Sequence, residues 1–179
     1  ANLDGSNPKQ LTESNDWQFA SPIFSNDGNY VYVSQTSWIK RTFEIANEHG
    51  PNLKLLYNQH GGMEKPMWER VKATIDYLQK CGVRIDGVGW QAHVSAGWEK
   101  VPGNIQSLDR LIRWTHARDL EFHVTENTVW MDDPATGSQA SQAATYRTIL
   151  KKLVDHSKSG VVVWNVWQLC DADIQRPQK

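Results

Sequence analysis

The chain has 179 residues, of which 39% are apolar, with 19 Lys and Arg against 20 Asp and Glu. This length suits one domain, and no segment approaches the roughly 18 to 20 consecutive apolar residues that a membrane helix needs. A net charge of −1, with the basic residues scattered along the chain, argues against a nucleic-acid or membrane-surface partner.

The first 33 residues are rich in Asn, Ser, Asp and Gly and show no hydrophobic periodicity. We therefore predict that residues 1–33 form an irregular loop segment, and that this loop lies over the face that carries the polar residues described below. Residues 34–179 make up the domain proper. Because the chain starts at Ala1 with neither a start Met nor an apolar signal segment, we expect a processed or truncated product.

Helical and strand patterns alternate through the rest of the chain. Apolar residues recur at helical spacing in four segments, 34–48, 66–81, 104–119 and 141–157. Pro66 suits a first helical turn, and Asn104 suits an N-cap. Short continuous apolar runs, typical of buried parallel strands, occupy 53–57, 85–91, 122–126 and 161–167. The alternation predicts right-handed βαβ units around a parallel sheet.

Two α/β architectures fit this order, a doubly wound sheet and a (β/α) barrel. No Gly-x-Gly-x-x-Gly follows a strand and there is no Walker-type Lys, so a nucleotide-binding sheet lacks support. Polar and aromatic residues instead follow each predicted strand: Asn58 and His60, Gln91 and His93, Glu126 and Asn127, Trp164 and Trp167. Barrel active sites lie at that end of the strands, which favours the barrel.

Tryptophan is unusually frequent, with nine residues. Trp38, Trp68 and Trp114 lie in helical patterns among apolar residues and are interpreted as packing residues. The other candidates lie at or just beyond strand-like runs, beside polar and Gly residues, where an indole ring can stack on a sugar. They are Trp90, Trp98, Trp130, Trp164 and Trp167.

Cysteine and histidine give no sign of a metal or a cofactor. Cys81 and Cys170 lack metal-ligand spacing. We expect them to lie at opposite ends of a barrel, too far apart for a disulfide. The six His residues are dispersed, without a His-x-x-x-His pair, so a catalytic zinc site is not expected.

Glu126 is the strongest candidate for chemistry. It follows the apolar run Phe122–Thr125, so its carboxylate is predicted at the mouth of a buried strand rather than on a solvated helix face. The preceding strand ends in Gln91 and His93, an amide and an imidazole that can orient this carboxylate. We expect His123 to point to the opposite face of the strand and to be packed there.

Residues 85–93, Ile-Asp-Gly-Val-Gly-Trp-Gln-Ala-His, resemble a strand signature of glycoside hydrolase family 10, the retaining endo-β-1,4-xylanases. Further segments resemble the same family in the same order: 43–46 its preceding helix, 55–58 its Tyr-Asn strand, 123–126 its Thr-Glu nucleophile strand and 163–166 its Trp-bearing last strand. The resemblance extends over about residues 38 to 175.

The resemblance implies a (β/α)8 TIM barrel of which this chain holds about the last four βα units. It implies that Glu126 is the nucleophile and that His93 hydrogen-bonds to it. Asn58, Gln91 and Trp164 would bind sugar, with Trp130 and Trp98 as further substrate-binding candidates. The second carboxyl group of a retaining glycosidase would lie upstream of Ala1. The resemblance also implies xylan as the substrate, no cofactor, and a secreted protein.

The sequence departs from the family pattern at three places. Gln59 stands where the family often has an Asp after Tyr-Asn. Thr128 stands where the family commonly has an Asp that contacts the histidine, and Trp167 and Gln168 replace a Ser-Asp pair. Because the resemblance extends over most of the chain, the leading interpretation is still a xylanase-like hydrolase. The alternative is a catalytically inactive carbohydrate-binding or vestigial half-barrel. In either case we expect a complement, the N-terminal half-barrel or a second copy of the chain.

Overall fold

The computed structural model describes residues 23–24, 31–32, 36–131, 135 and 137–167. These residues fall into two units that meet between Thr42 and Phe43. The first unit contains a short antiparallel pair, β1 (Ile23–Phe24) with β2 (Val31–Tyr32), and the first half of α1 (Thr36–His49). Most of the predicted loop segment 1–33 lies outside the described residues, so its expected place over the polar face stays a prediction.

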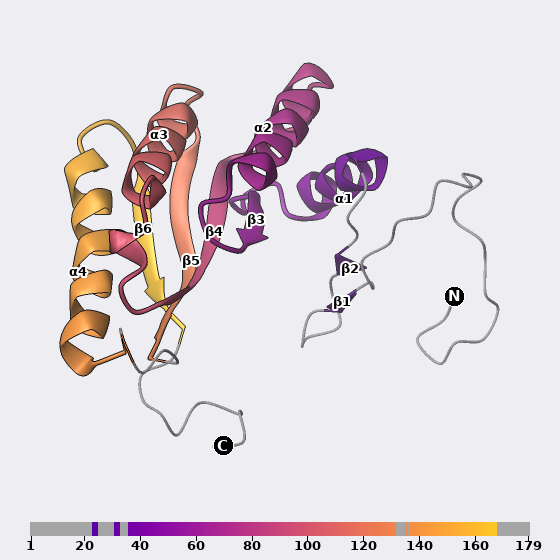
Figure 1. The fold of residues 1–179 in the computed structure, drawn as a ribbon. Helices are drawn as coiled ribbons and strands as arrows, with labels where there is room; N and C mark the ends of the chain where they lie inside the picture. Colours follow the sequence, from indigo (N-terminus) through magenta and orange to yellow (C-terminus); the bar gives the residue numbers. More distant parts are fainter. Residues whose placement is uncertain (1–22, 25–30, 33–35, 132–134, 136, 168–179) are drawn as a thin grey trace. The chain divides into compact units, whose positions relative to one another are not determined.

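The second unit is built on a four-stranded sheet in the order β3-β4-β5-β6 (Figure 1). The strands are β3 (Leu56–His60), β4 (Gly87–Ser95), β5 (Glu121–Trp130) and β6 (Val162–Val166), and every neighbouring pair is parallel. The helices α2 (Lys65–Lys80), α3 (Asn104–His116) and α4 (Gln139–His156) connect successive strands and cover one face of the sheet. The predicted α/β fold with parallel strands is confirmed.

Two predicted boundaries are wrong for identifiable reasons. The first strand of the sheet begins at Leu56, not at residue 53. The backbone N–H of Leu55 donates to the Asp86 carboxylate and Arg84 donates to the carbonyl of Leu53, so side chains satisfy these two backbone groups, while the carbonyl of Leu55 still accepts from the backbone N–H of Asp86. The N-cap of α3 is Gly103, whose φ of 91° suits glycine, while the Asn104 amide donates to the carbonyl of Trp98.

The helix-covered face of the sheet carries the hydrophobic core. Val88, Trp90, Phe122 and Val124 are fully buried on the strands. They share the core with buried aliphatic residues of the three helices, namely Ile75, Leu78, Leu108, Ile112, Ile149 and Leu153. Trp68 is buried as predicted, and the Arg118 guanidinium lies 4.0 Å from the ring centre of the half-buried Trp114. These contacts hold the helices against the sheet.

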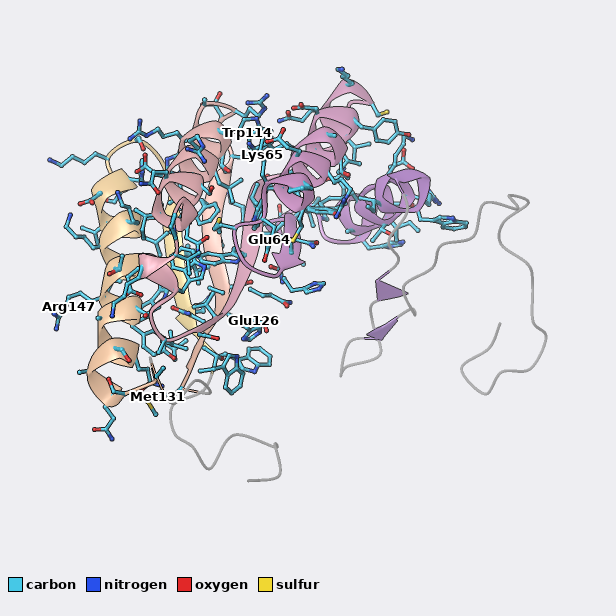
Figure 2. All side chains as sticks on the ribbon, viewed as in Figure 1. Glu64, Lys65, Trp114, Glu126, Met131 and Arg147 are labelled. Atoms are coloured by element: carbon cyan, nitrogen blue, oxygen red, sulfur yellow. The ribbon has the colours of Figure 1, made fainter. Side chains whose placement is uncertain are left out.

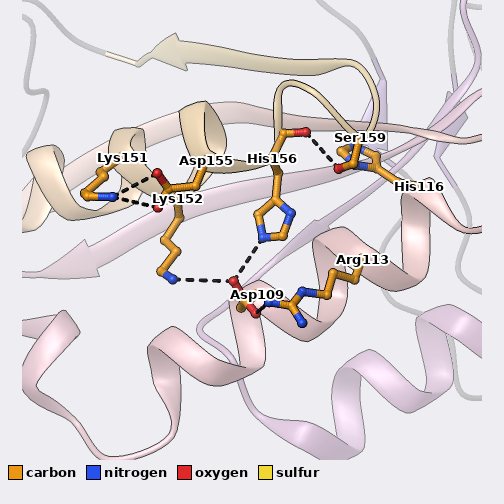
Figure 3. Close-up of polar contacts among 8 residues, drawn as sticks. All are labelled: Asp109, Arg113, His116, Lys151, Lys152, Asp155, His156 and Ser159. Carbon is orange, nitrogen blue, oxygen red and sulfur yellow. Dashed lines mark hydrogen bonds and ion pairs between the residues drawn. The ribbon is translucent and has the colours of Figure 1, made fainter.

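A polar network joins α3 to α4 (Figure 3). The Asp109 carboxylate of α3 lies 2.9 Å from Nε2 of the buried His156 on α4 and also contacts Lys152 of α4 and Arg113 of α3. Burial by itself would raise the pKa of the Asp109 carboxyl. The hydrogen bonds from His156 and Lys152 and the nearby cationic charges outweigh it, so the pKa is lowered. The network therefore favours ionised Asp109.

Neither a membrane-length apolar helix nor a disulfide is found in the described part of the chain. No helix there is long and apolar enough to cross a bilayer. Cys81 is an exposed free thiol, and Cys170 lies outside the described residues, so the predicted absence of a disulfide stays a prediction.

Candidate active site

A β-bulge in β5 determines which face Glu126 occupies. Trp90 of β4 pairs with Val124, but the next residue, Gln91, pairs with Glu126, so Thr125 is an extra residue in β5. Strand residues alternate between faces, and Val124 is fully buried under the helices. Without the extra residue Glu126 would share that buried face; with it, Glu126 shares the opposite face with Gln91.

We call that opposite side the inner face, defined by Asn58, Gln91, His93, Glu126 and Trp130. In the register of the sheet, His60, Gln91 and Glu126 form one row across β3, β4 and β5. His93 and Thr128 form the next row, and Ser95 and Trp130 the row after it. Figure 2 shows Glu126 toward the carboxyl ends of these strands. The sheet thus gathers polar side chains from three strands at one end of the inner face.

The contact between His93 and Glu126 lies at the centre of this group. Nε2 of His93 is 3.0 Å from Oε2 of Glu126, as the sequence predicted. Both side chains are partly buried, with exposed fractions of 28% and 18%. In the described part of the chain no Lys or Arg contacts this carboxylate, so the imidazole is the group that orients it.

A second hydrogen bond joins β5 to β3 across the intervening strand β4. The Thr125 hydroxyl, on the bulge, donates to Oδ1 of Asn58 on β3 at 2.8 Å. It passes over Gly89 of β4, where an added Cβ would lie only 2.5 Å from Asn58 Oδ1 and 3.0 Å from Thr125 Cγ2. A larger residue at this position would have to displace the Asn58 amide, so Gly89 leaves room for the bond that holds this amide beside the candidate site.

A separate ion cluster lies at the amino end of β5. Glu121 contacts Lys54 at 2.8 Å and Nε2 of His123 at 2.9 Å. Hydrogen bonds from Lys54 and His123 lower the pKa of the Glu121 carboxyl, and the same bond with Glu121 raises the pKa of the exposed Lys54. The expectation for His123 is corrected here: because of the bulge, this half-buried residue lies on the same face as Glu126.

Besides Trp90, which is fully buried in the core, two of the predicted sugar-binding indoles face elsewhere. Trp98 is only 7% exposed and packs against Trp90 with ring centres 5.5 Å apart, so it belongs to the core. Trp164 pairs with Val124 on the helix-covered side. Its indole N–H donates to the buried Asn127 amide at 2.9 Å, and its ring lies 6.3 Å from Tyr146 of α4. Neither ring is offered to a sugar on the inner face.

Gln91 and Trp130 stay candidates for sugar binding, and Trp167 joins them. Both are half-buried on the inner face, in rows next to the row of His93. Trp167, which follows β6, is 56% exposed, and its ring centre lies 6.2 Å from that of His93 in an edge contact. The sequence had grouped Trp167 with possible stacking residues, but its place beside His93 depends on the irregular β5–β6 register and was not predicted.

The part of the chain that the structure describes holds no group of three or more His, Cys, Asp or Glu side chains able to bind a metal ion. Chemically, the inner face offers an oriented carboxylate, a neighbouring imidazole, amide groups from Asn58 and Gln91, and exposed indole surface. Such a set suits the binding of a neutral glycoside and attack by a carboxylate at its acetal carbon.

Comparison with known proteins identifies the family of the chain. Residues 21–174 match glycosyl hydrolase family 10. The chain belongs to this family. The four parallel strands and the helices that connect them correspond to part of a (β/α) TIM barrel, as the sequence predicted.

Similar proteins include two curated xylanases. Endo-1,4-beta-xylanase A of Caldicellulosiruptor saccharolyticus is 31% identical over 100 residues, which cover 56% of this chain and 28% of that protein. Endo-1,4-beta-xylanase 2 of Aureobasidium pullulans is 26% identical over 166 residues, 84% of this chain and 45% of that protein. The chain thus spans less than half the length of these relatives.

Solved structures show the same fold. The endo-1,4-beta-xylanase from Caldicellulosiruptor owensensis has 26% sequence identity and superposes with a TM-score of 0.64, over 75% of this chain and 43% of that one. A psychrophilic family 10 endo-beta-1,4-xylanase superposes with a TM-score of 0.67 at 24% identity, over 80% of this chain and 44% of that one. This chain therefore shares its fold with part of these family 10 xylanases.

Proposed function

We propose that this chain contributes the nucleophile side of a retaining endo-β-1,4-xylanase active site, with Glu126 as the nucleophile. The observation that carries the proposal is the 3.0 Å contact between Glu126 Oε2 and His93 Nε2 on the inner face. The imidazole N–H orients the carboxylate and leaves Oε1 to attack. Asn58, Gln91, Trp130 and Trp167 are the proposed sugar-binding residues.

The proposed reaction has two steps. Glu126 Oε1 attacks the anomeric carbon of a xylose unit, the bond from that carbon to the glycosidic oxygen breaks, and the leaving oxygen takes a proton from a second carboxyl group. Water then attacks the same carbon, gives its proton to the second carboxylate, and releases Glu126. The second carboxyl group is proposed to come from the part of the barrel that precedes this chain.

An activated substrate tests the nucleophile without that second group. A dinitrophenyl xylobioside releases a leaving group that needs no protonation, so the chain should liberate dinitrophenolate. The variant Glu126→Gln should lose about 10⁴-fold or more of the rate. Trapping with a 2-fluoro xylobiosyl fluoride, followed by peptide mass spectrometry, should place the label on Glu126.

Glu121 provides a matched control on the same strand. Its side chain is 17% exposed against 18% for Glu126, and it also lies within 3.0 Å of an imidazole. Glu121→Gln should keep its activity because this carboxylate already binds Lys54 and lies at the other end of the strand. Equal loss in both variants would contradict the assignment. Binding of xylo-oligosaccharide without any turnover would favour the carbohydrate-binding alternative.

We further propose that the strand edges of this chain pair with the rest of a barrel. β3 and β6 are the outer strands of the sheet, and Leu53, Val161 and Val166 beside them are exposed. Open parallel edges with apolar side chains favour pairing with another strand. The complement is either the preceding half-barrel or a second copy of the chain.

Light scattering and activity on unactivated xylan together distinguish these partners. A complex with the preceding half should hydrolyse xylan, since it brings the second carboxyl group. A homodimer should not, because it brings only another Glu126. A stable folded monomer at micromolar concentration would contradict the need for any partner. We also propose, from the family resemblance, that the protein is secreted. Detection of the protein in the culture medium rather than in the cells would test this.

A further inference from the structure

Two buried polar atoms on the inner face lack a hydrogen-bond partner among the described residues. They are Nδ1 of His93 and the hydroxyl Oγ1 of Thr128. Their residues lie directly opposite each other in the β4–β5 register. A buried polar atom left unpaired lowers stability, so such atoms in a native protein call for an explanation. Here both atoms belong to one row of the sheet, beside the candidate nucleophile.

The contact on the other side of the His93 ring determines what Nδ1 can do. An ionised carboxylate can only accept hydrogen bonds, so Nε2, at 3.0 Å from Glu126 Oε2, has to carry a proton. In a neutral imidazole only one nitrogen is protonated, and Nδ1 then presents a lone pair. The atom that satisfies Nδ1 must therefore be a donor.

Thr128, the register partner of His93 on β5, carries a hydroxyl that can act as this donor. Thr128 is only 6% exposed, and its hydroxyl group can donate after rotation about the Cβ–Oγ1 bond. A carboxylate at this position would do the opposite: it would accept from Nδ1, and with Glu126 on the other side it would stabilise the doubly protonated, cationic ring.

We propose that Thr128 is a positioning residue that holds His93 as the neutral tautomer protonated at Nε2, by donating to Nδ1 directly or through one water molecule. The role deepens the proposed function, since it serves the contact between His93 and Glu126. A neutral imidazole orients the carboxylate without placing a full positive charge beside it. Glu126 thereby keeps the electron density that attack on the anomeric carbon requires.

The titratable groups that face His93 have to be known before its response to a substitution at position 128 is interpreted. Among the described residues, β5 contributes the Glu126 carboxylate in direct contact, and β3 contributes the exposed His60 in the row of Glu126. After β6, Trp167 contacts the ring edge and does not titrate. A response of His93 to substitution at position 128 can therefore be compared with His60, which should not respond.

Nitrogen NMR of the full ¹⁵N-labelled chain tests the tautomer directly. Long-range proton–nitrogen correlations near neutral pH should show His93 protonated at Nε2 only, with Nδ1 accepting. The same pattern should persist in Thr128→Ser and give way to exchange between tautomers in Thr128→Val. In Thr128→Asp, both ring nitrogens of His93 should carry protons, because the new carboxylate accepts from Nδ1. Protonation at Nδ1 in the unmodified chain, or an unchanged tautomer in Thr128→Val, would overturn the proposal.

Kinetics on the activated xylobioside supply a second readout. Thr128→Val should lower kcat about tenfold or more with KM unchanged, because a wrong tautomer breaks the bond to Glu126. Thr128→Ser should restore it. If Glu126→Gln proves fully active, the nucleophile assignment fails while the NMR result still decides the role of Thr128. If Thr128→Val does not fold, the tautomer of the unmodified chain and of Thr128→Ser decides alone.

Discussion

The two faces of β5 meet different demands, and neighbouring residues show this most clearly. Asn127 is fully buried on the helix-covered face, where its amide donates to the Ala92 carbonyl and accepts from the Trp164 indole. Glu126, one residue earlier, is partly exposed on the inner face and contacts only His93 among the described residues. One face is paired and closely packed for stability, whereas the other holds reactive groups ready for a ligand.

The largest change in unfolding free energy is expected for Phe122→Ala on the helix-covered face. Phe122 is fully buried, so the variant should lose about 3–5 kcal/mol of unfolding free energy, a large part of a typical total of about 5–15. Gln91→Ala on the inner face is the control and should change stability by about 0.5 kcal/mol or less. Urea unfolding followed by circular dichroism measures both. Similar losses in the two variants would remove the distinction between the faces.

The next test compares the adjacent residues. Asn127→Ala should cost about 1–3 kcal/mol because it leaves the Trp164 indole N–H and the Ala92 carbonyl without their partner. Glu126→Ala should leave the free energy of unfolding nearly unchanged and remove turnover of the activated substrate. A strongly destabilised Glu126→Ala would mean that the carboxylate serves the fold.

Gly89→Ala tests the crowding under the bond between Asn58 and Thr125. The added Cβ would meet Asn58 Oδ1 at 2.5 Å, and overpacking of this kind costs about 1–3 kcal/mol. Adding Asn58→Ala to Gly89→Ala removes the closest atom and should recover part of the loss, which a double-mutant cycle measures. No recovery would show that the conflict lies elsewhere.

The smallest effect is expected in the network between α3 and α4. Because the folded-state pKa of Asp109 is lowered, its contribution to stability is present above its unfolded pKa of about 4 and is lost as the pH falls through the folded value. Asp109→Asn should therefore cost about 1 kcal/mol at about pH 7 and much less at about pH 3. Urea titrations of both proteins at the two pH values give the difference. A gap that widens toward acid would contradict the sign.

Sequence reasoning identified the parallel α/β fold and the contact between His93 and Glu126, because continuous apolar runs and polar residues at strand ends are direct consequences of such a fold. It misplaced Trp90, Trp98, Trp164 and His123. Each of these errors concerns the face to which a side chain points, and a continuous apolar run does not reveal it. The register shifts that decide it arise from pairing between strands distant in the sequence.

The extra residue in β5 divides this strand into two halves of opposite phase. Up to Val124, even-numbered positions point under the helices; from Glu126 onward, even-numbered positions point to the inner face. Any protein engineer who grafts a new side chain onto this strand has to number positions separately on either side of Thr125. An alignment that places a one-residue gap on the wrong side of this point would exchange buried positions for ligand-facing ones while leaving the overall fold unchanged.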